Sequence, residues 1–296
     1  MAEIEFLASP ALRGRGSGTI DEQVTATHLA KALERAGIEA PGDPPVRFQS
    51  VSFGASKSQN VLGIIRPPGN TAASTIPVLV LGAHYDHLGV KDGEIYPGAD
   101  DNASGTAAVL AVARALVARR SELGRPVVIA FFGAEETGMN GSRAFVTSGV
   151  VPRDSVFAMV NVDMVGRPLA DQAILLPALA LAGIDPNASV GVDGLHGRPG
   201  FEQIVRAACI AEHHRAVTID DLPAPLRPTI ERLSRGRGDN WSFERVGIPA
   251  IFFSSSESSD YHQPTDTIDS LSPDLVATRA RIVLQTVVGL TKLSAP

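Results

Sequence analysis

Cysteine is almost missing from this sequence of 296 residues, which contains one, Cys209. A lone cysteine excludes a disulfide within the chain and a metal cluster held by several thiolates. Cys209 lies in the segment FEQIVRAACIAEHH, whose apolar residues recur at helical intervals. We therefore expect a small buried side chain on a helix rather than a reactive thiol.

Long apolar runs are missing as well. No stretch reaches the roughly 18 apolar residues that a membrane-spanning helix needs. The first residues, MAEIEFLASP, lack the basic start and the apolar stretch of a secretory signal peptide. The sequence therefore fits a cytoplasmic protein, or an exported one whose signal has been removed, and it predicts no membrane partner.

Charge of one sign is not in large excess. The chain has 26 Lys and Arg against 32 Asp and Glu, which gives a net charge of −6. This balance offers no electrostatic reason to expect a nucleic acid partner. Because α/β enzymes of this length often form one unit, we predict a single domain over residues 1–296.

Short apolar runs alternate with amphipathic segments along most of the chain. Helical spacing predicts helices over 19–36, 103–120 and 271–293. Apolar runs of strand length predict strands over 60–67, 78–85, 127–134, 156–166 and 249–255. Strands that are apolar throughout are covered on both faces, so we expect an α/β fold. The predicted architecture is a three-layer α/β/α sandwich around a mixed, mostly parallel central sheet.

Residues 167–240 are less regular and rich in proline and glycine. The pattern here predicts a strand, a helix and long loops, which in a compact domain are often functional. The basic stretch LRPTIERLSRGRG (226–238) carries Arg227, Arg232, Arg235 and Arg237. We interpret this stretch as a solvated loop, and the alternative is a lid or pocket rim that receives a substrate carboxylate.

Acidic and imidazole side chains lie at or after the ends of four of the five predicted strands, and just before the helix predicted at 103–120. In open α/β sheets, ligands bind beyond the carboxyl ends of the strands. The residues at these positions are His84, Asp86 and His87, then Asp100 and Asp101, Glu135 and Glu136, Asp163, and finally His262 and Asp266. Carboxylates and imidazoles without sulfur suit zinc, cobalt or manganese.

The carboxylates are too many for one metal ion. Two ions about 3.5–4 Å apart would use them, with one aspartate bridging the pair and each ion taking one histidine and one further carboxylate. The adjacent Glu135 and Glu136, at the end of the run VVIAFFGAEE, can then differ in function. One can bind metal, and the other can accept a proton from metal-activated water.

Five motifs in this order resemble the co-catalytic dizinc exopeptidase family: H-x-D, G-A-D-D-N-A-S-G, A-E-E-x-G, N-x-D-M-x-G and Y-H-x-x-x-D-T. This family includes bacterial leucyl aminopeptidases, glutamate carboxypeptidase II and glutaminyl cyclases. The similarity begins at FLASPALRGRGSGT and weakens between about Arg167 and Gly238. It implies a metallopeptidase catalytic domain with two Zn²⁺ per chain, for which Co²⁺ or Mn²⁺ are substitutes.

The resemblance also implies a function for single residues. It implies that His84 and Asp163 bind the first ion and that Glu136 and His262 bind the second. Asp101 is implied to bridge the two ions. Glu135 is implied to be the base that activates a metal-bridging water. Asp86 is implied to accept the second ring N–H of His84 and thereby to fix the orientation of that ring.

Several positions near these motifs leave alternatives open. Asp100 either caps the helix that starts near residue 103 or supports Asp101. His87 either lines the site or hydrogen-bonds a loop, and Asp266 is either a turn residue or a supporting partner. In GDNWSF, Asp239 falls where the family often has an Asp-His pair, but the next residue is Asn240. The short stretch 48–60 leaves no room for the protease-associated domain that some family members insert.

The resemblance implies hydrolysis of the terminal peptide bond of a peptide substrate, and we expect an aminopeptidase. A carboxypeptidase of the glutamate carboxypeptidase type is an alternative, because the arginines of 227–237 would suit a terminal carboxylate. A glutaminyl cyclase-like acyltransferase is less favoured, since such enzymes usually work with one metal. A non-catalytic binding domain is least favoured, because all expected ligands are present. Relatives are commonly exported, which favours a periplasmic or secreted protein over a cytoplasmic one.

Overall fold

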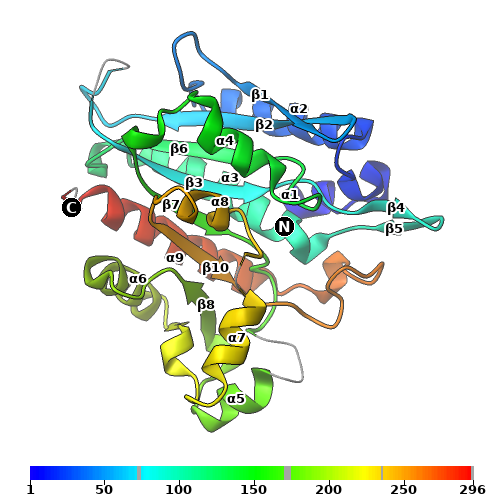
Figure 1. The fold of residues 1–296 in the computed structure, drawn as a ribbon, viewed down its shortest axis with the longest axis vertical. Coiled ribbons are helices and arrows are strands. Elements are labelled where there is room, and N and C mark those ends of the chain that lie inside the picture. The colour runs from blue at the N-terminus through cyan, green and yellow to red at the C-terminus, as the bar shows by residue number, and fades with distance from the viewer. Residues whose placement is uncertain (72–74, 170–174, 235, 295–296) are drawn as a thin grey trace.

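The computed structural model describes residues 1–71, 75–169, 175–234 and 236–294 (Figure 1). In these residues eight strands form one sheet in the order β1-β2-β6-β3-β7-β10-β8-β9, and β4 and β5 form a separate hairpin. The pairs β6–β3, β3–β7, β7–β10 and β8–β9 are parallel, and the other three pairs are antiparallel. The predicted mixed, mostly parallel sheet is therefore confirmed.

The predicted elements are all present with slightly different ends. The strands are β1 Phe48–Phe53, β2 Ser56–Ile65, β3 Val78–His84, β4 Gly89–Lys91, β5 Glu94–Tyr96, β6 Val127–Phe132, β7 Val156–Val162, β8 Ser189–Asp193, β9 Arg215–Val217 and β10 Ala250–Ser254. The α-helices are α1 Ala2–Leu7, α2 Ile20–Arg35, α3 Gly105–Ala118, α4 Asn140–Ser148, α5 Leu175–Leu181, α6 Pro199–Ala211, α7 Arg227–Ser234, α8 Asn240–Glu244 and α9 Pro273–Thr291. The strands β1, β4 and β5 escaped prediction because they are short or exposed on one side.

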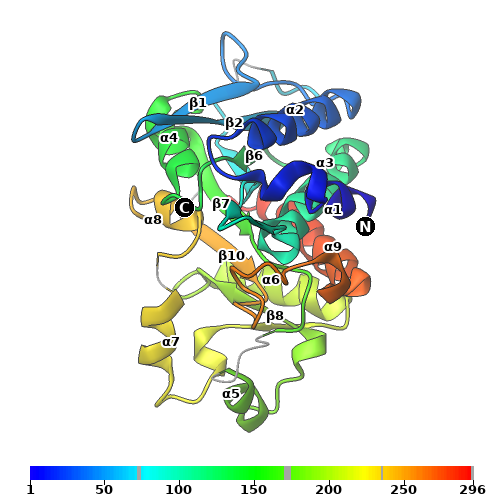
Figure 2. The ribbon, with the colours of Figure 1, turned by 90° about the vertical axis from the view of Figure 1, so that its right-hand side faces the viewer.

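Helices cover both faces of the sheet (Figure 2). Helices α2, α3 and α9 lie on one face, and α4 and α8 lie on the other. The first face buries Leu29, Val109 and Val283 in one large core, whereas Phe145 and Phe243 pack in a second core on the opposite face. All seven residues of β3 are buried, as expected of a strand covered twice. The described residues include no helix long and apolar enough to cross a bilayer.

The segment 167–240 is more regular than predicted. It contains the helices α5, α6 and α7 and the strands β8 and β9, and Cys209 is buried on α6 as expected. The basic stretch is mostly the helix α7 rather than a loop, with Arg235 outside the described residues. Helices α5 and α7 and the end of β9 pack around a small separate cluster, which includes Leu179 and Val217, whereas α6 and β8 contribute to the large core. Because few apolar residues contribute to so small a core, the hydrophobic periodicity that predicts helices and strands is weak here.

Candidate metal centre

The parallel strands β3, β6, β7 and β10 bring their carboxyl ends to one edge of the sheet. His84 is the last residue of β3, and Asp163 directly follows β7. Glu135 and Glu136 follow β6 after a two-residue turn, and His262 lies in the segment after β10. The hydrogen-bond register of the sheet thus collects side chains that are up to 178 positions apart in the sequence.

Two groups of three side chains share Asp101. In the first, His84 Nε2 lies 3.3 Å from Asp101 Oδ1 and 3.4 Å from Asp163 Oδ1. In the second, His262 Nε2 lies 3.2 Å from Asp101 Oδ2 and 3.2 Å from Glu136 Oε2. Zinc bonds of about 2.0–2.2 Å at a tetrahedral centre place neighbouring ligand atoms about 3.3 Å apart. In each group the two distances from the histidine nitrogen have this value, and each group uses a different oxygen of Asp101.

The burial of these carboxylates calls for cations. Asp101 and Asp163 are each 4% exposed, and the side chain of His262, at 35%, is the most open of the five. Among the described residues, Asp163 Oδ1 and Glu136 Oε1 are buried without a hydrogen-bond partner. A buried carboxylate that lacks partners is costly unless an ion neutralises it. The donor set, with two buried oxygens that accept no hydrogen bond, therefore fits two divalent ions of the zinc type.

His87 is a further member of this centre, although its sequence position is equally compatible with a hydrogen bond to a loop. Its ring is buried, and its Nδ1 lies 2.7 Å from Glu136 Oε1 and 3.8 Å from Asp101 Oδ2. Two atoms 2.7 Å apart are too close to be neighbouring ligands of one tetrahedral zinc ion. His87 is therefore placed as an ion-pair partner of Glu136 at Oε1, whereas His262 faces Oε2. Against burial and repulsion from Asp101, His262 and His87 lower the pKa of Glu136 to about 2.

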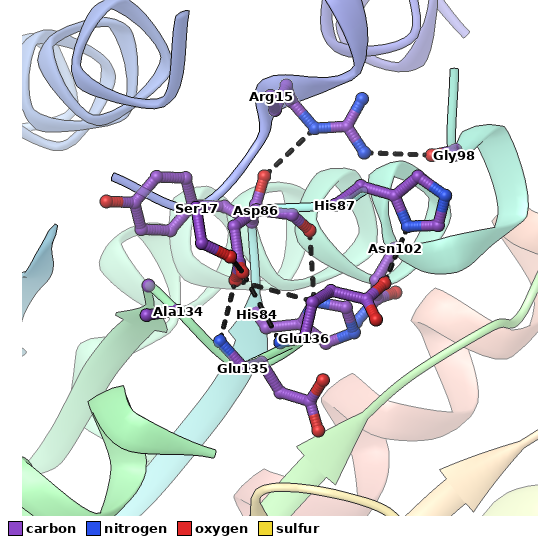
Figure 3. A network of polar contacts seen from close by, with 12 residues as sticks. Arg15, Ser17, His84, Asp86, His87, Gly98, Asn102, Ala134, Glu135 and Glu136 are labelled. Carbon is purple, nitrogen blue, oxygen red and sulfur yellow. Dashed lines mark hydrogen bonds and ion pairs between the residues drawn. The ribbon is translucent and has the colours of Figure 1, made fainter. Parts of the chain in front are cut away.

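Asp86 lies in the centre, but its carboxylate does not accept the ring N–H of His84 as predicted. That carboxylate is 3.8 Å from His84 Nδ1, and the backbone oxygen of Asp86 is closer, at 3.2 Å. The carboxylate instead accepts hydrogen bonds from the Ser17 hydroxyl at 2.6 Å and from the backbone N–H groups of Glu135 and Glu136 at 3.0 and 3.4 Å (Figure 3). The chain turns directly after β3, so the main chain, not the side chain, faces the imidazole.

Asp266 supports the turn that carries Asp101. Its carboxylate accepts the backbone N–H groups of Asp100 and Asp101 at 3.0–3.2 Å. The Asp100 carboxylate faces the other way and accepts the Ser104 hydroxyl at 2.9 Å and the Gly166 N–H at 2.7 Å. Asp266 is thus a supporting partner, and Asp100 ties the turn to the segment after β7.

Glu135 belongs to neither group of three. Figure 3 shows its side chain leading away from that of Glu136, although both leave the same turn. Burial raises the pKa of Glu135 well above its usual value, His84 opposes this, and Asp239 and Glu136 add to it. A carboxylate with a raised pKa is a stronger proton acceptor, which is what general base catalysis near neutral pH needs. Asp239 is fully buried, and burial raises its pKa to about 7.

Sequence comparison matches this chain to a peptidase family and to proteins that are named aminopeptidases. The sequence model described as peptidase family M28 matches residues 60–287. Leucine aminopeptidase 1 of Leptosphaeria maculans is 28% identical over 256 residues, which cover 81% of this chain and 60% of that protein. The probable lipoprotein aminopeptidase LpqL of Mycobacterium tuberculosis is 28% identical over 291 residues, covering 88% and 51%. The chain thus spans between half and two thirds of the length of these curated relatives.

Structure comparison gives the same fold. The LapA aminopeptidase of Legionella pneumophila superposes with a TM-score of 0.73 at 19% identity, covering 99% of this chain and 70% of that one. BSAP, a zinc aminopeptidase from Bacillus subtilis, gives 0.71 at 17% identity, covering 99% and 95%. These likenesses confirm the predicted fold class. Because the matching family model spans well over half of the sequence, this chain belongs to peptidase family M28.

Proposed function

We propose that this chain is a dizinc aminopeptidase, which removes residues from the N-terminus of peptides. The observation that carries the proposal is the pair of three-residue groups that share Asp101, in each of which a histidine nitrogen lies 3.2–3.4 Å from two carboxylates. The names of its relatives, leucine aminopeptidase and zinc aminopeptidase, support the choice of an amino-terminal substrate.

The five ligands divide between the two ions as the resemblance implies. His84 and Asp163 would hold one ion, His262 and Glu136 the other, and Asp101 both. Bound zinc supplies a Lewis acid that polarises a carbonyl, and it lowers the pKa of water to roughly 7.

Glu135 is proposed to move the proton in this reaction. Its carboxylate lies outside both ligand groups, so it is free of the ions and able to accept a proton from the attacking water. It then gives that proton to the leaving amine, which would otherwise depart as a poor leaving group. Asp86 contributes by fixing the turn from which both glutamates project.

The structure gives no reason to prefer a carboxypeptidase. Arg227 donates hydrogen bonds to the backbone oxygens of Leu222 and Asp220, at 2.8 and 2.6 Å, and Arg237 forms an ion pair with Glu257. Two of the arginines that would grip a terminal carboxylate are thus engaged within the chain.

Peptides blocked at one end test the proposal. We expect cleavage of peptides with a free N-terminus, whether or not the C-terminus is amidated, and no cleavage of N-acetylated ones. A zinc chelator should abolish the activity, and added zinc should restore it. Cleavage that needs a free C-terminus would show a carboxypeptidase instead, and pyroglutamate formation with one ion per chain would show a cyclase. A chain that binds two zinc ions but cleaves none of a broad panel would be a non-catalytic member.

The two histidines near Glu136 should differ in their effect on zinc content. We expect His262→Ala to lower the content from two ions to about one per folded chain, because a direct ligand is lost. His87→Ala should keep two ions and weaken one of them by about 10–100-fold, as is usual for an outer partner of a ligand. Elemental analysis and competition with a chelator measure both effects. If His87→Ala lost an ion while His262→Ala kept two, the assignment of these residues would have to be exchanged.

A further inference from the structure

The turn that carries both glutamates is held by its backbone in an unusual way. Each of the four successive N–H groups of residues 133–136 donates a hydrogen bond to a side chain from elsewhere in the fold. The acceptors are, in chain order of the donors, Asn60 at 3.1 Å, Glu22 at 3.2 Å, and Asp86 at 3.0 and 3.4 Å. These three residues lie on β2, on α2 and after β3, and we call them the amide brace.

The brace acts on a residue with a disfavoured backbone conformation. Ala134, which directly precedes Glu135, has φ of +54°, in the left-handed region that side chains other than glycine rarely adopt. Such conformations persist where the surrounding structure determines them from several sides. The N–H of Ala134 is bound by Glu22, and its carbonyl accepts the N–H of Asn140 at 3.0 Å. Both peptide groups of this residue are therefore fixed, and with them the direction in which the Glu135 side chain departs.

The Glu22 side chain is buried and held by several hydrogen bonds. It is 1% exposed on the first turn of α2, and its carboxylate also accepts the Ser58 hydroxyl at 2.5 Å and the Gly18 N–H at 2.6 Å. Burying a carboxylate is costly unless hydrogen bonds satisfy it. Helix stability does not require this burial, because an acidic residue near a helix N-terminus is favourable while exposed. Of these contacts, the one with Ala134 reaches the turn, and those with Ser58 and Gly18 hold the carboxylate in place to make it.

We propose that Glu22 is a positioning residue, which sets the direction of the Glu135 carboxylate through the amide of Ala134. This inference rests on the role of base proposed for Glu135. The hydrogen bond from Ser17 to Asp86 ties the same stretch of chain to the other carboxylate of the brace. The start of α2 and the turn before it therefore help to position the site, although they precede the region 60–287 that matches the family model.

The test compares three variants. Glu22→Ala removes both acceptor oxygens, Glu22→Gln keeps the length and one of them, and Asp21→Ala is the matched control. Asp21 is the other acidic residue of the first turn of α2, and among the described residues no hydrogen bond joins its side chain to 133–136. The measurements are hydrogen exchange of the amides along the whole chain, zinc content, and kcat and KM on the substrate that the wild type prefers.

With Glu22→Ala we expect faster exchange confined to the segments around 133–137 and 17–22. With zinc content kept, kcat should fall by about 10-fold to 100-fold, as misplacement of a catalytic group does, with KM changed less than about twofold. Glu22→Gln should lie between this variant and the wild type, and it carries the test if Glu22→Ala does not fold. Asp21→Ala should match the wild type in exchange at 133–137 and in kcat.

Two results would overturn the inference. One is unchanged exchange at 133–137 in both Glu22 variants. The other is exchange that rises throughout the chain while kcat per zinc-loaded folded chain stays at the wild-type value, which is a purely structural effect. The exchange measurement needs no substrate, so it tests whether Glu22 holds the turn even if the wild type cleaves no peptide. The absence of cleavage by the wild type would instead refute the proposed function.

Discussion

Replacement of Glu135 by glutamine is expected to lower kcat by about 10²–10⁴-fold, the usual effect of removing a general base. Zinc content should stay at that of the wild type, because this carboxylate lies outside both ligand groups. The amide of glutamine keeps the size of the side chain and loses the ability to take up a proton. Initial rates under saturating peptide, together with elemental analysis of the same sample, measure the two effects separately.

The neighbouring residue provides the matched control. Glu136→Gln makes the same chemical change at the adjacent glutamate. There, however, it removes the charge of a proposed ligand, which is also the ion-pair partner of His87. We expect this variant to lose zinc from one of the two positions. If Glu135→Gln retained nearly normal turnover, or lost zinc as Glu136→Gln does, the proton-transfer role would belong to another residue.

The strand-end positions were the part of the site that could be predicted from sequence. His84, Asp163 and the two glutamates follow runs so apolar that their strands were unmistakable, and parallel strands deliver such residues to one edge. The order of the motifs then supplied the resemblance, and with it the assignment of Asp101 as the bridge. His87 shares the first of these motifs, yet nothing in the local sequence shows that its ring would turn toward Glu136.

Contacts between distant elements could not be predicted in the same way. The carboxylates of Asp86 and Glu22 both face the backbone of the turn 133–136, and this depends on where α2 packs against the sheet. Periodicity placed that helix correctly but said nothing about which turn its buried acid would meet.

Removal of the metal ions is expected to abolish activity and also to loosen the fold. Without cations, Asp101, Asp163 and Glu136 would hold their charges close together in a largely buried space, and two of them have a buried oxygen that accepts no hydrogen bond. A ligand present at 100 times its dissociation constant stabilises the folded chain by about 2.7 kcal/mol. For a chain of 296 residues, that corresponds to a fall in Tm of about 4 °C for each ion removed by chelation. Thermal unfolding followed with zinc, with a chelator, and after zinc is added back measures the change.

Asp101→Asn should reproduce this effect by mutation, and more strongly than the loss of any other single ligand. Each oxygen of Asp101 serves a different group, so the loss of its charge weakens both positions, whereas His262→Ala should empty one. Asp100→Asn is the matched control, because the adjacent carboxylate faces Ser104 and Gly166 instead of the ligand groups. We expect fewer than one zinc ion per chain and no measurable turnover in Asp101→Asn, with zinc retained in Asp100→Asn. Two ions still bound in Asp101→Asn, or a Tm that does not change when zinc is withdrawn from the wild type, would contradict a shared carboxylate between two cations.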